Sequence, residues 1–141
     1  DAKAKAFIKQ VIRARKDYKG SGNPDLYTTE DMLTSMLLLT DTTGRDLYTD
    51  ESQLAKKLRV NEIITVPVME GIKGVNGGDL MGIVCNLSDY NVGADKGGAI
   101  NMFEDFDIDY NQEKFLIETR CSGALTKPYS AIALELDEAI A

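Results

Sequence analysis

The sequence predicts one compact domain of α+β or mixed α/β class. Amphipathic helical patterns fill its first part, whereas β-branched and strictly alternating segments fill its last part. Its 141 residues are enough to bury roughly two thirds of the extended surface on folding. With 43% hydrophobic and 28% charged residues, the chain is typical of folded proteins, which excludes a disordered or membrane-spanning class.

Three helices are expected in the first 60 residues. The first spans residues 1–19, has a basic outer face and stops at Gly20-Ser21-Gly22. After a short strand at residues 26–27, Thr28 or Thr29 can cap a second helix with acidic residues in its first turn. Asp50 and Gln53 resemble a capping box, which opens a short third helix through Leu58.

The middle of the chain alternates strands with turns. Residues 63–66 are β-branched, and Pro67 places this strand at a sheet edge or at its own end because it lacks a backbone donor. Residues 71–78 are glycine-rich and predict a surface loop or hairpin tip, followed by a strand at residues 80–85. Asn86 or Ser88 is then expected to cap a single turn.

The last third predicts an antiparallel meander. Phe106, Ile108 and Tyr110 alternate with three aspartates, a period of two that indicates a half-buried strand. Further strands are expected at residues 114–121 and 129–136. The aspartates then form a solvated or ion-paired face, with Lys114 and Arg120 as the nearest cations.

Charge is divided unevenly along the chain. The net charge is −7, the wrong sign for a protein whose main task is to neutralise phosphates. Residues 1–19 nevertheless carry +5 and the remainder −12. Such a helix could contact nucleic acid or an acidic membrane, but a solvated face or an acidic protein partner is the favoured interpretation.

The residue types exclude several kinds of catalysis. The chain has no histidine, so His-containing triads, dyads and zinc sites are absent. Cys85 and Cys121 match neither a redox nor a zinc-binding spacing, and we expect both to be buried free thiols, in keeping with a reducing compartment. No catalytic residue, metal ligand or cofactor site is predicted.

Three acidic or glycine-rich motifs suggest chemical roles that their residues do not support. The row Asp105-x-Asp107-x-Asp109 begins like a calcium loop, but Tyr110 and Leu116 stand where a glycine and a glutamate are required. Residues 93–98 are glycine-rich without the order of a phosphate-binding loop. The adjacent carboxylates 104–105 and 137–138 show no sign of forming a perturbed pair.

Six segments spread over nearly the whole chain carry a resemblance to a known family. They are residues 29–39, DTTGRDLY at 41–48, VPV at 66–68, GAINMFEDFDIDYNQ at 98–112, KFLIETRC at 114–121 and GALTKPYSAI at 123–132. They resemble the major capsid proteins of tailed bacteriophages, whose fold is shared with encapsulin shells and the herpesvirus capsid floor.

That resemblance implies a domain organisation. The 141 residues would be a single compact fragment of a longer capsid protein, as the start at Asp1 within a helical pattern also suggests. Residues 1–19 would be the end of the spine helix, and residues 20–100 would form the core of the axial domain, a mixed sheet flanked by helices. Residues 101–141 would be antiparallel strands that return through the peripheral domain.

The implied function is structural. The chain would assemble in the cytoplasm of a bacterial host into a virion shell, through contacts with copies of itself in pentamers and hexamers. Scaffold, portal or decoration proteins would be further partners, packaged DNA would be contacted only non-specifically, and no membrane or cofactor is implied. The residues expected at interfaces are Lys9, Arg13, Lys16, Glu70, Lys73, Asn76, Asp105, Asp107 and Asp109.

Three other functions remain open from the sequence. An encapsulin-like compartment shell would use the same fold. A small acidic enzyme that depends on a divalent metal belongs to a different class, as does a nucleic-acid-binding module led by the basic helix.

Overall fold

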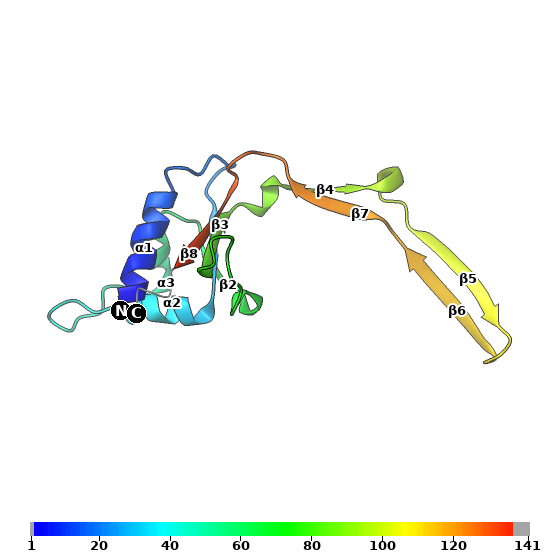
Figure 1. Cartoon of the computed structure of the whole chain (residues 1–141), viewed down its shortest axis with the longest axis horizontal. Coiled ribbons are helices and arrows are strands. Elements are labelled where there is room, and N and C mark those ends of the chain that lie inside the picture. The colour runs from blue at the N-terminus through cyan, green and yellow to red at the C-terminus, as the bar shows by residue number, and fades with distance from the viewer. Residues whose placement is uncertain (1, 137–141) are drawn as a thin grey trace. The chain divides into compact units, whose positions relative to one another are not determined.

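The chain divides into two compact units, both visible in Figure 1. The computed structural model describes residues 2–136. The first unit comprises Asp1–Asp89 and Lys127–Ala141, and the second comprises Tyr90–Thr126. Together they hold helices and several sheets, which confirms the mixed α and β class. The sequence led us to expect one compact fragment whose core ends at residue 100. The structure instead separates residues 90–126 from the rest, and the last strand pairs within the first unit.

The first unit holds the three predicted helices, but the first of them ends five residues before the expected end at residue 19, because residues 15–17 already form a turn. The three helices are α1 (Ala2–Ala14), α2 (Glu30–Leu37) and α3 (Glu51–Leu58). Thr29 caps α2, since its side chain accepts a hydrogen bond from the backbone N–H of Met32 at 3.4 Å. Asp50 caps α3 in the same way, accepting from the N–H of Gln53 at 2.9 Å. Both predicted caps are therefore confirmed.

A four-stranded mixed sheet forms the other layer of the first unit, in the order β2-β1-β3-β8. The strands are β1 (Asp25–Thr28), β2 (Ile63–Thr65), β3 (Asp79–Cys85) and β8 (Ala131–Leu136). β1 pairs parallel with β2 and antiparallel with β3, which in turn pairs antiparallel with β8. β2 is an edge strand that ends before Pro67, as the proline predicts.

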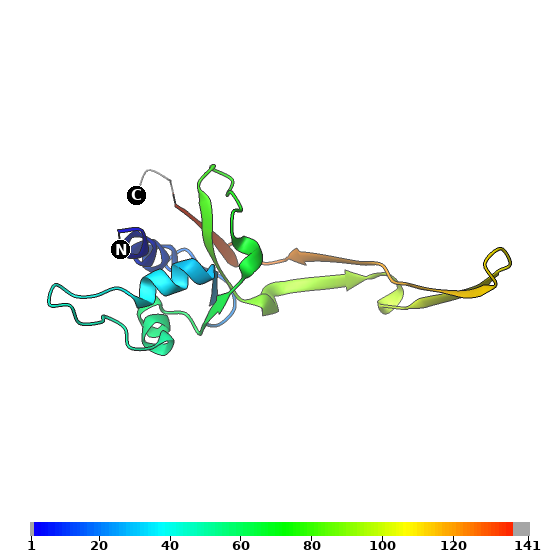
Figure 2. The same ribbon diagram turned by 90° about the horizontal axis from the view of Figure 1, so that it is seen from below.

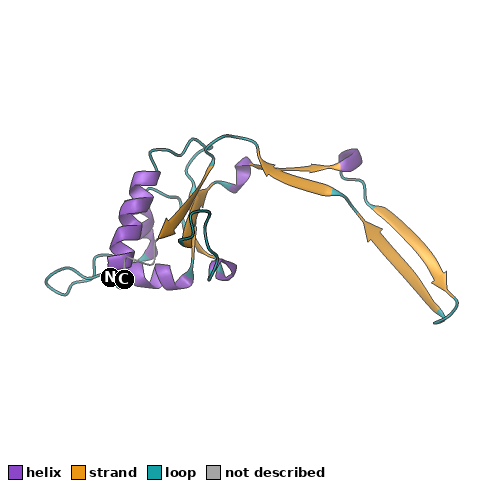
Figure 3. Ribbon diagram, in the orientation of Figure 1, coloured by secondary structure: helices purple, strands orange, loops and turns teal. Residues whose placement is uncertain are grey.

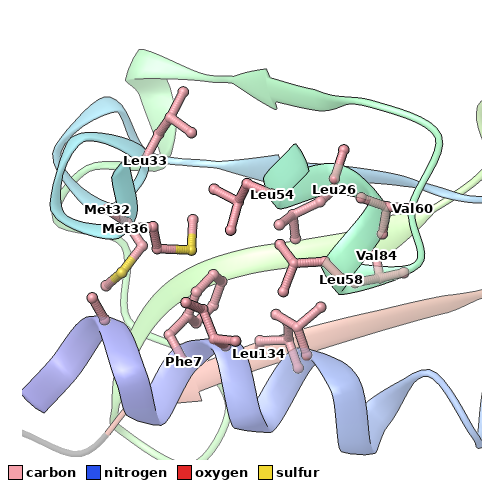
Figure 4. Close-up of a cluster of buried hydrophobic side chains, with 14 of the residues drawn as sticks. Phe7, Leu26, Met32, Leu33, Met36, Leu54, Leu58, Val60, Val84 and Leu134 are labelled. Atoms are coloured by element: carbon pink, nitrogen blue, oxygen red, sulfur yellow. The ribbon is translucent and has the colours of Figure 1, made fainter. Parts of the chain in front are cut away.

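The helices lie together on one side of this sheet (Figure 2). Between the two layers lies one apolar core, in which Phe7 of α1 points toward Leu134 of β8 and the methionines of α2 (Figure 4). Phe7, Leu26, Leu54 and Leu58 are completely buried. Burying such side chains stabilises a fold by about 1.5–3 kcal/mol each, so this core accounts for the stability of the first unit.

Gly82 allows α1 to approach the sheet closely. A Cβ atom at this position would lie 2.8 Å from Cζ of Phe7 and 3.2 Å from the carbonyl oxygen of Tyr27. No side chain fits in that space, so the glycine is required by packing rather than by a turn.

The second unit consists of two strand pairs joined end to end by a short turn (Figure 3). β4 (Tyr90–Ala94) pairs antiparallel with β7 (Cys121–Leu125). β5 (Asn101–Asp107) pairs antiparallel with β6 (Gln112–Glu118). Each pair is only two strands wide, and together they are called the ribbon below.

Several predictions for the last third are wrong. β5 ends at Asp107, and residues 108–111 form the turn instead of a continued strand. Phe106, Ile108 and Tyr110 are 52%, 83% and 75% exposed, so the strand is not half-buried. The region is no meander, because β6 pairs with β5, β7 returns to β4 and β8 joins the other unit. An alternating pattern specifies two faces but not whether anything covers them.

The expectation for the two cysteines is also only partly met. Cys85 is half-buried and free, and burial raises the pKa of its thiol. Cys121 is free but exposed, so the prediction of a buried thiol is wrong for this residue. It lies in β7, where the two-stranded ribbon has no further layer to bury it.

Candidate functional site

The β5–β6 pair presents one face that is both apolar and acidic. Cross-strand neighbours share a face, and the register places three pairs together: Met102 with Ile117, Glu104 with Phe115, and Phe106 with Glu113. The four apolar members are each 52–68% exposed. Neither glutamate has an ion-pair partner among residues 2–136. We refer to these six residues as the apolar-acidic face.

The opposite face of the same pair carries two ion pairs. Lys114 stands directly across from Asp105 in the register and forms an ion pair with Asp107. Glu118 is paired with Arg120, with Nε and Oε1 3.4 Å apart. Of the two cations predicted near the aspartate row, Lys114 pairs with an aspartate of the row, whereas Arg120 pairs with Glu118 instead. This face also exposes Phe103 and Leu116, which are cross-strand neighbours.

The end of the β5–β6 pair is a tight polar turn. The carboxylate of Asp107 accepts a hydrogen bond from the N–H of Asp109 at 3.1 Å, and Asn111 has a positive φ of 51°. Asparagine tolerates this left-handed conformation better than most residues. The aspartate row therefore divides between two roles, because Asp105 and Asp107 lie on the strand and Asp109 lies in the turn.

The outer face of α1 carries a stripe of exposed cations. Lys5, Lys9 and Arg13 follow one another at spacings of four residues and are exposed. None of the three forms an ion pair with any residue from 2 to 136. Lys16 is exposed in the turn that follows. We call Lys5, Lys9 and Arg13 the basic stripe.

The glycine-rich segment at residues 70–78 is a hairpin-like loop beside β8. The N–H of Gly74 donates to the carbonyl of Gly78 at 2.8 Å, which closes its tip. Lys73 is ion-paired with Asp79 at 2.6 Å, and the N–H of Asn76 donates to Oε2 of Glu135 at 3.1 Å. Glu70 is exposed at the start of the segment. The predicted hairpin tip is confirmed, and Lys73 and Asn76 are engaged within the first unit.

A polar cluster at the end of the first unit escaped the sequence analysis. Asp89 is 5% exposed, and its carboxylate accepts from the N–H and Oγ of Ser21 at 2.7 and 2.6 Å. Lys127 lies 3.5 Å from the same carboxylate and also contacts Ser21 Oγ. These hydrogen bonds from Ser21, followed by the charge of Lys127, lower the pKa of Asp89.

Further contacts complete this cluster. The hydroxyl of Tyr18 and the side-chain amide of Asn86 both donate to the carbonyl of Ser21, at 3.0 and 2.9 Å. Burial and then the nearby Asp89 raise the pKa of Tyr18. Asp89 and Lys127 are the two residues of the first unit that flank the ribbon in sequence. The cluster therefore holds together the two chain segments of the first unit that end at Asp89 and begin at Lys127. Only the tertiary structure could reveal this role, because the residues are far apart in sequence.

No group of three or more His, Cys, Asp and Glu side chains within residues 2–136 is arranged to hold a metal ion. The carboxylates of residues 137 and 138 lie outside the described residues. No helix in the described part of the chain is long and apolar enough to cross a membrane.

Comparison with known proteins adds no family. No family model matches the sequence, and no curated protein matches it.

Proposed function

We propose that the chain is part of a shell-forming structural protein, the major capsid protein of a tailed bacteriophage or prophage, which acts by self-association. The observation that carries this proposal is the exposed apolar surface of the ribbon. Phe106, Phe115 and Ile117 are each more than half exposed on one face, and Phe103 and Leu116 on the other. Apolar patches of this kind mark interaction surfaces in folded proteins.

The energetics of the ribbon favour a partner. An isolated two-stranded hairpin is marginally stable in water, because it buries little apolar area to offset the ordering of its backbone. Contacts with other copies supply the missing burial. A shell subunit needs many such lateral contacts, each of modest strength, and complementary charges set their register.

The resemblance of several sequence phrases to tailed-phage capsid proteins gives the proposal its specific form. It also leaves the encapsulin-like shell as the related alternative. The two are distinguished by the parent gene, which would lie beside portal and protease genes for a capsid protein and beside a cargo enzyme for a compartment shell.

Sedimentation velocity of the 141-residue chain over a hundredfold range of protein concentration tests self-association. We expect assemblies to grow with concentration and to be visible as rings or sheets by electron microscopy. Phe106→Ser/Phe115→Ser should reduce assembly, since it removes two exposed rings from the ribbon. Leu38→Ser is the matched control, because Leu38 is similarly exposed but belongs to the first unit.

A chain that stays monomeric at every concentration would contradict the proposal. Other outcomes would support the functions left open by the sequence. A rise in melting temperature with calcium, magnesium or manganese would favour a metal-dependent enzyme. Binding of duplex DNA that survives physiological salt would favour a nucleic-acid-binding module.

A further inference from the structure

The apolar-acidic face cannot pack well against its own equivalent. Glu104 and Glu113 lie within the face, each opposite a phenylalanine across the strands. Stacking two such faces would bring four carboxylates together among aromatic rings. Burying unpaired like charges is strongly unfavourable, so the occupant of this face must bring cations.

The basic stripe of α1 has the complementary features. Its three cations are exposed and have no acidic partner within residues 2–136. Their aliphatic stems can cover the phenyl rings while their charged ends reach the glutamates. Lysine and arginine also interact favourably with the faces of aromatic rings.

The spacings of the two surfaces agree. Lys5 to Arg13 spans eight residues of helix, which is about 12 Å at 1.5 Å per residue. Met102 to Phe106 spans four residues of strand, which is about 13 Å. Successive side chains lie about 6 Å apart on the stripe and about 7 Å apart along the strand face.

We infer that the apolar-acidic face of one copy docks on the basic stripe of α1 in a second copy. The inference rests on the proposed function, self-association, and specifies the surfaces that perform it. Because the two surfaces differ, the contact is heterologous. Each copy then offers one free stripe and one free ribbon face, which leads to closed rings or extended arrays rather than to an isolated dimer.

Charge reversal on each surface, made in the full 141-residue chain, tests the contact. Lys9→Glu/Arg13→Glu makes the stripe acidic, and Glu104→Lys/Glu113→Lys makes the ribbon face basic. We expect each variant alone to associate at least tenfold more weakly than the unmodified chain, measured by sedimentation velocity at low salt. Raising the salt concentration should weaken the self-association of the unmodified chain as well, because salt screens the attraction between the two surfaces.

Mixing the two variants provides the decisive measurement. The acidic ribbon of the first variant can dock on the basic stripe of the second, and the basic ribbon of the second can dock on the acidic stripe of the first. An equimolar mixture should therefore assemble, and so should one chain that carries all four substitutions. Failure of both to assemble would overturn the pairing.

Control variants separate this contact from general charge effects. Lys56→Glu/Lys57→Glu and Asp46→Lys/Glu62→Lys make the same changes of net charge at exposed positions of the first unit. They should associate normally. Circular dichroism checks folding, and the neutral variants Lys9→Gln/Arg13→Gln and Glu104→Gln/Glu113→Gln provide a second series that should weaken association less.

The inference and the proposed function fail in distinguishable ways. If the unmodified chain associates and the reversed variants associate equally well, the inference is wrong and self-association stands. If the unmodified chain does not associate at any concentration, both are wrong.

Discussion

Both units contain strands with large apolar side chains, but the first unit buries those side chains and the ribbon exposes them. In the first unit Leu26, Val84 and Leu134 of the sheet are at most 2% exposed. In the ribbon Phe103 and Phe115 are 52% and 58% exposed. The difference arises because three helices form a second layer in the first unit, whereas the ribbon contains only paired strands and short turns.

This contrast shows that apolar residues do not by themselves create a core. An apolar face is buried only when a second layer lies against it. The first unit contains both layers and depends on its own packing for stability. The ribbon offers its faces to a partner, so changes in it should affect association more than folding.

The largest expected effect comes from removing a core ring. Phe7→Ala should destabilise the first unit by about 3–5 kcal/mol, because the ring is completely buried and leaves a cavity. Phe115→Ala should change the unfolding free energy by less than about 0.5 kcal/mol, since the ring is more than half exposed. Urea unfolding at low protein concentration measures both. Equal losses in the two variants would show that the ribbon is part of the same folded core.

Two glycines allow a smaller version of the same comparison. Gly82→Ala should cost about 1–3 kcal/mol, because the new methyl group meets Phe7 and the Tyr27 carbonyl. Gly93→Ala in β4 should be close to neutral, since its Cβ would have only the Ser122 carbonyl within 4 Å, at 3.9 Å. Thermal unfolding of both variants checks this difference. A neutral Gly82→Ala would mean that α1 does not pack against β3 as closely as described.

Asp89 should give the first unit a pH-dependent component of stability. The pKa of its carboxyl is lowered in the folded protein, so its contribution is fully present above its unfolded pKa of about 3.9. That contribution is lost as the pH falls through the lower folded pKa. Asp89→Asn should therefore have a lower urea midpoint than the unmodified chain at pH 7, and the difference should shrink toward pH 3.

Asp46→Asn is the matched control for this titration, because Asp46 is exposed. Its unfolding midpoint should stay parallel to that of the unmodified chain over the same pH range. A pH-independent deficit in Asp89→Asn would show that Ser21 and Lys127 recognise the shape of the side chain rather than its charge.

The smallest effects concern single polar contacts in each unit. Thr29→Ala should cost about 1 kcal/mol, because α2 loses the cap that accepts from the N–H of Met32. Lys114→Ala should cost less than about 0.5 kcal/mol, since its pair with Asp107 is made by an exposed lysine on a ribbon face. Calorimetry of the two variants ranks them. The reverse order would mean that the ribbon pair contributes more to folding than the helix cap.

Local chemistry made part of this fold predictable. Thr29 and Asp50 identified the starts of two helices, because their side chains satisfy backbone donors only a few residues away. Pro67 marked the end of an edge strand for an equally local reason. The glycines at residues 71–78 likewise indicated a surface loop or hairpin tip, and the hydrogen bond from Gly74 to Gly78 closes such a tip.

The polar cluster could not be found in the same way. Asp89 and Lys127 lie 68 and 106 residues after Ser21 along the chain. None of the three residues belongs to a recognisable motif. In the sequence, Asp89 looks like any surface aspartate. The pairing of β3 with β1 and β8 brings the segments that contain Ser21, Asp89 and Lys127 together. Similarly, the aspartate row suggested a charged face, but only the register of β5 and β6 shows that Glu104 and Glu113 share the other face with apolar side chains.

The sequence alone determined the elements of this protein: where helices begin, which stretches alternate, and that one basic segment precedes an acidic remainder. Those properties depend on residues within a few positions of one another. Only the tertiary structure decided which apolar faces are covered, since β8 returns to the first sheet and leaves the ribbon two strands wide. Burial depends on contacts between distant segments, and periodicity along the chain does not encode them.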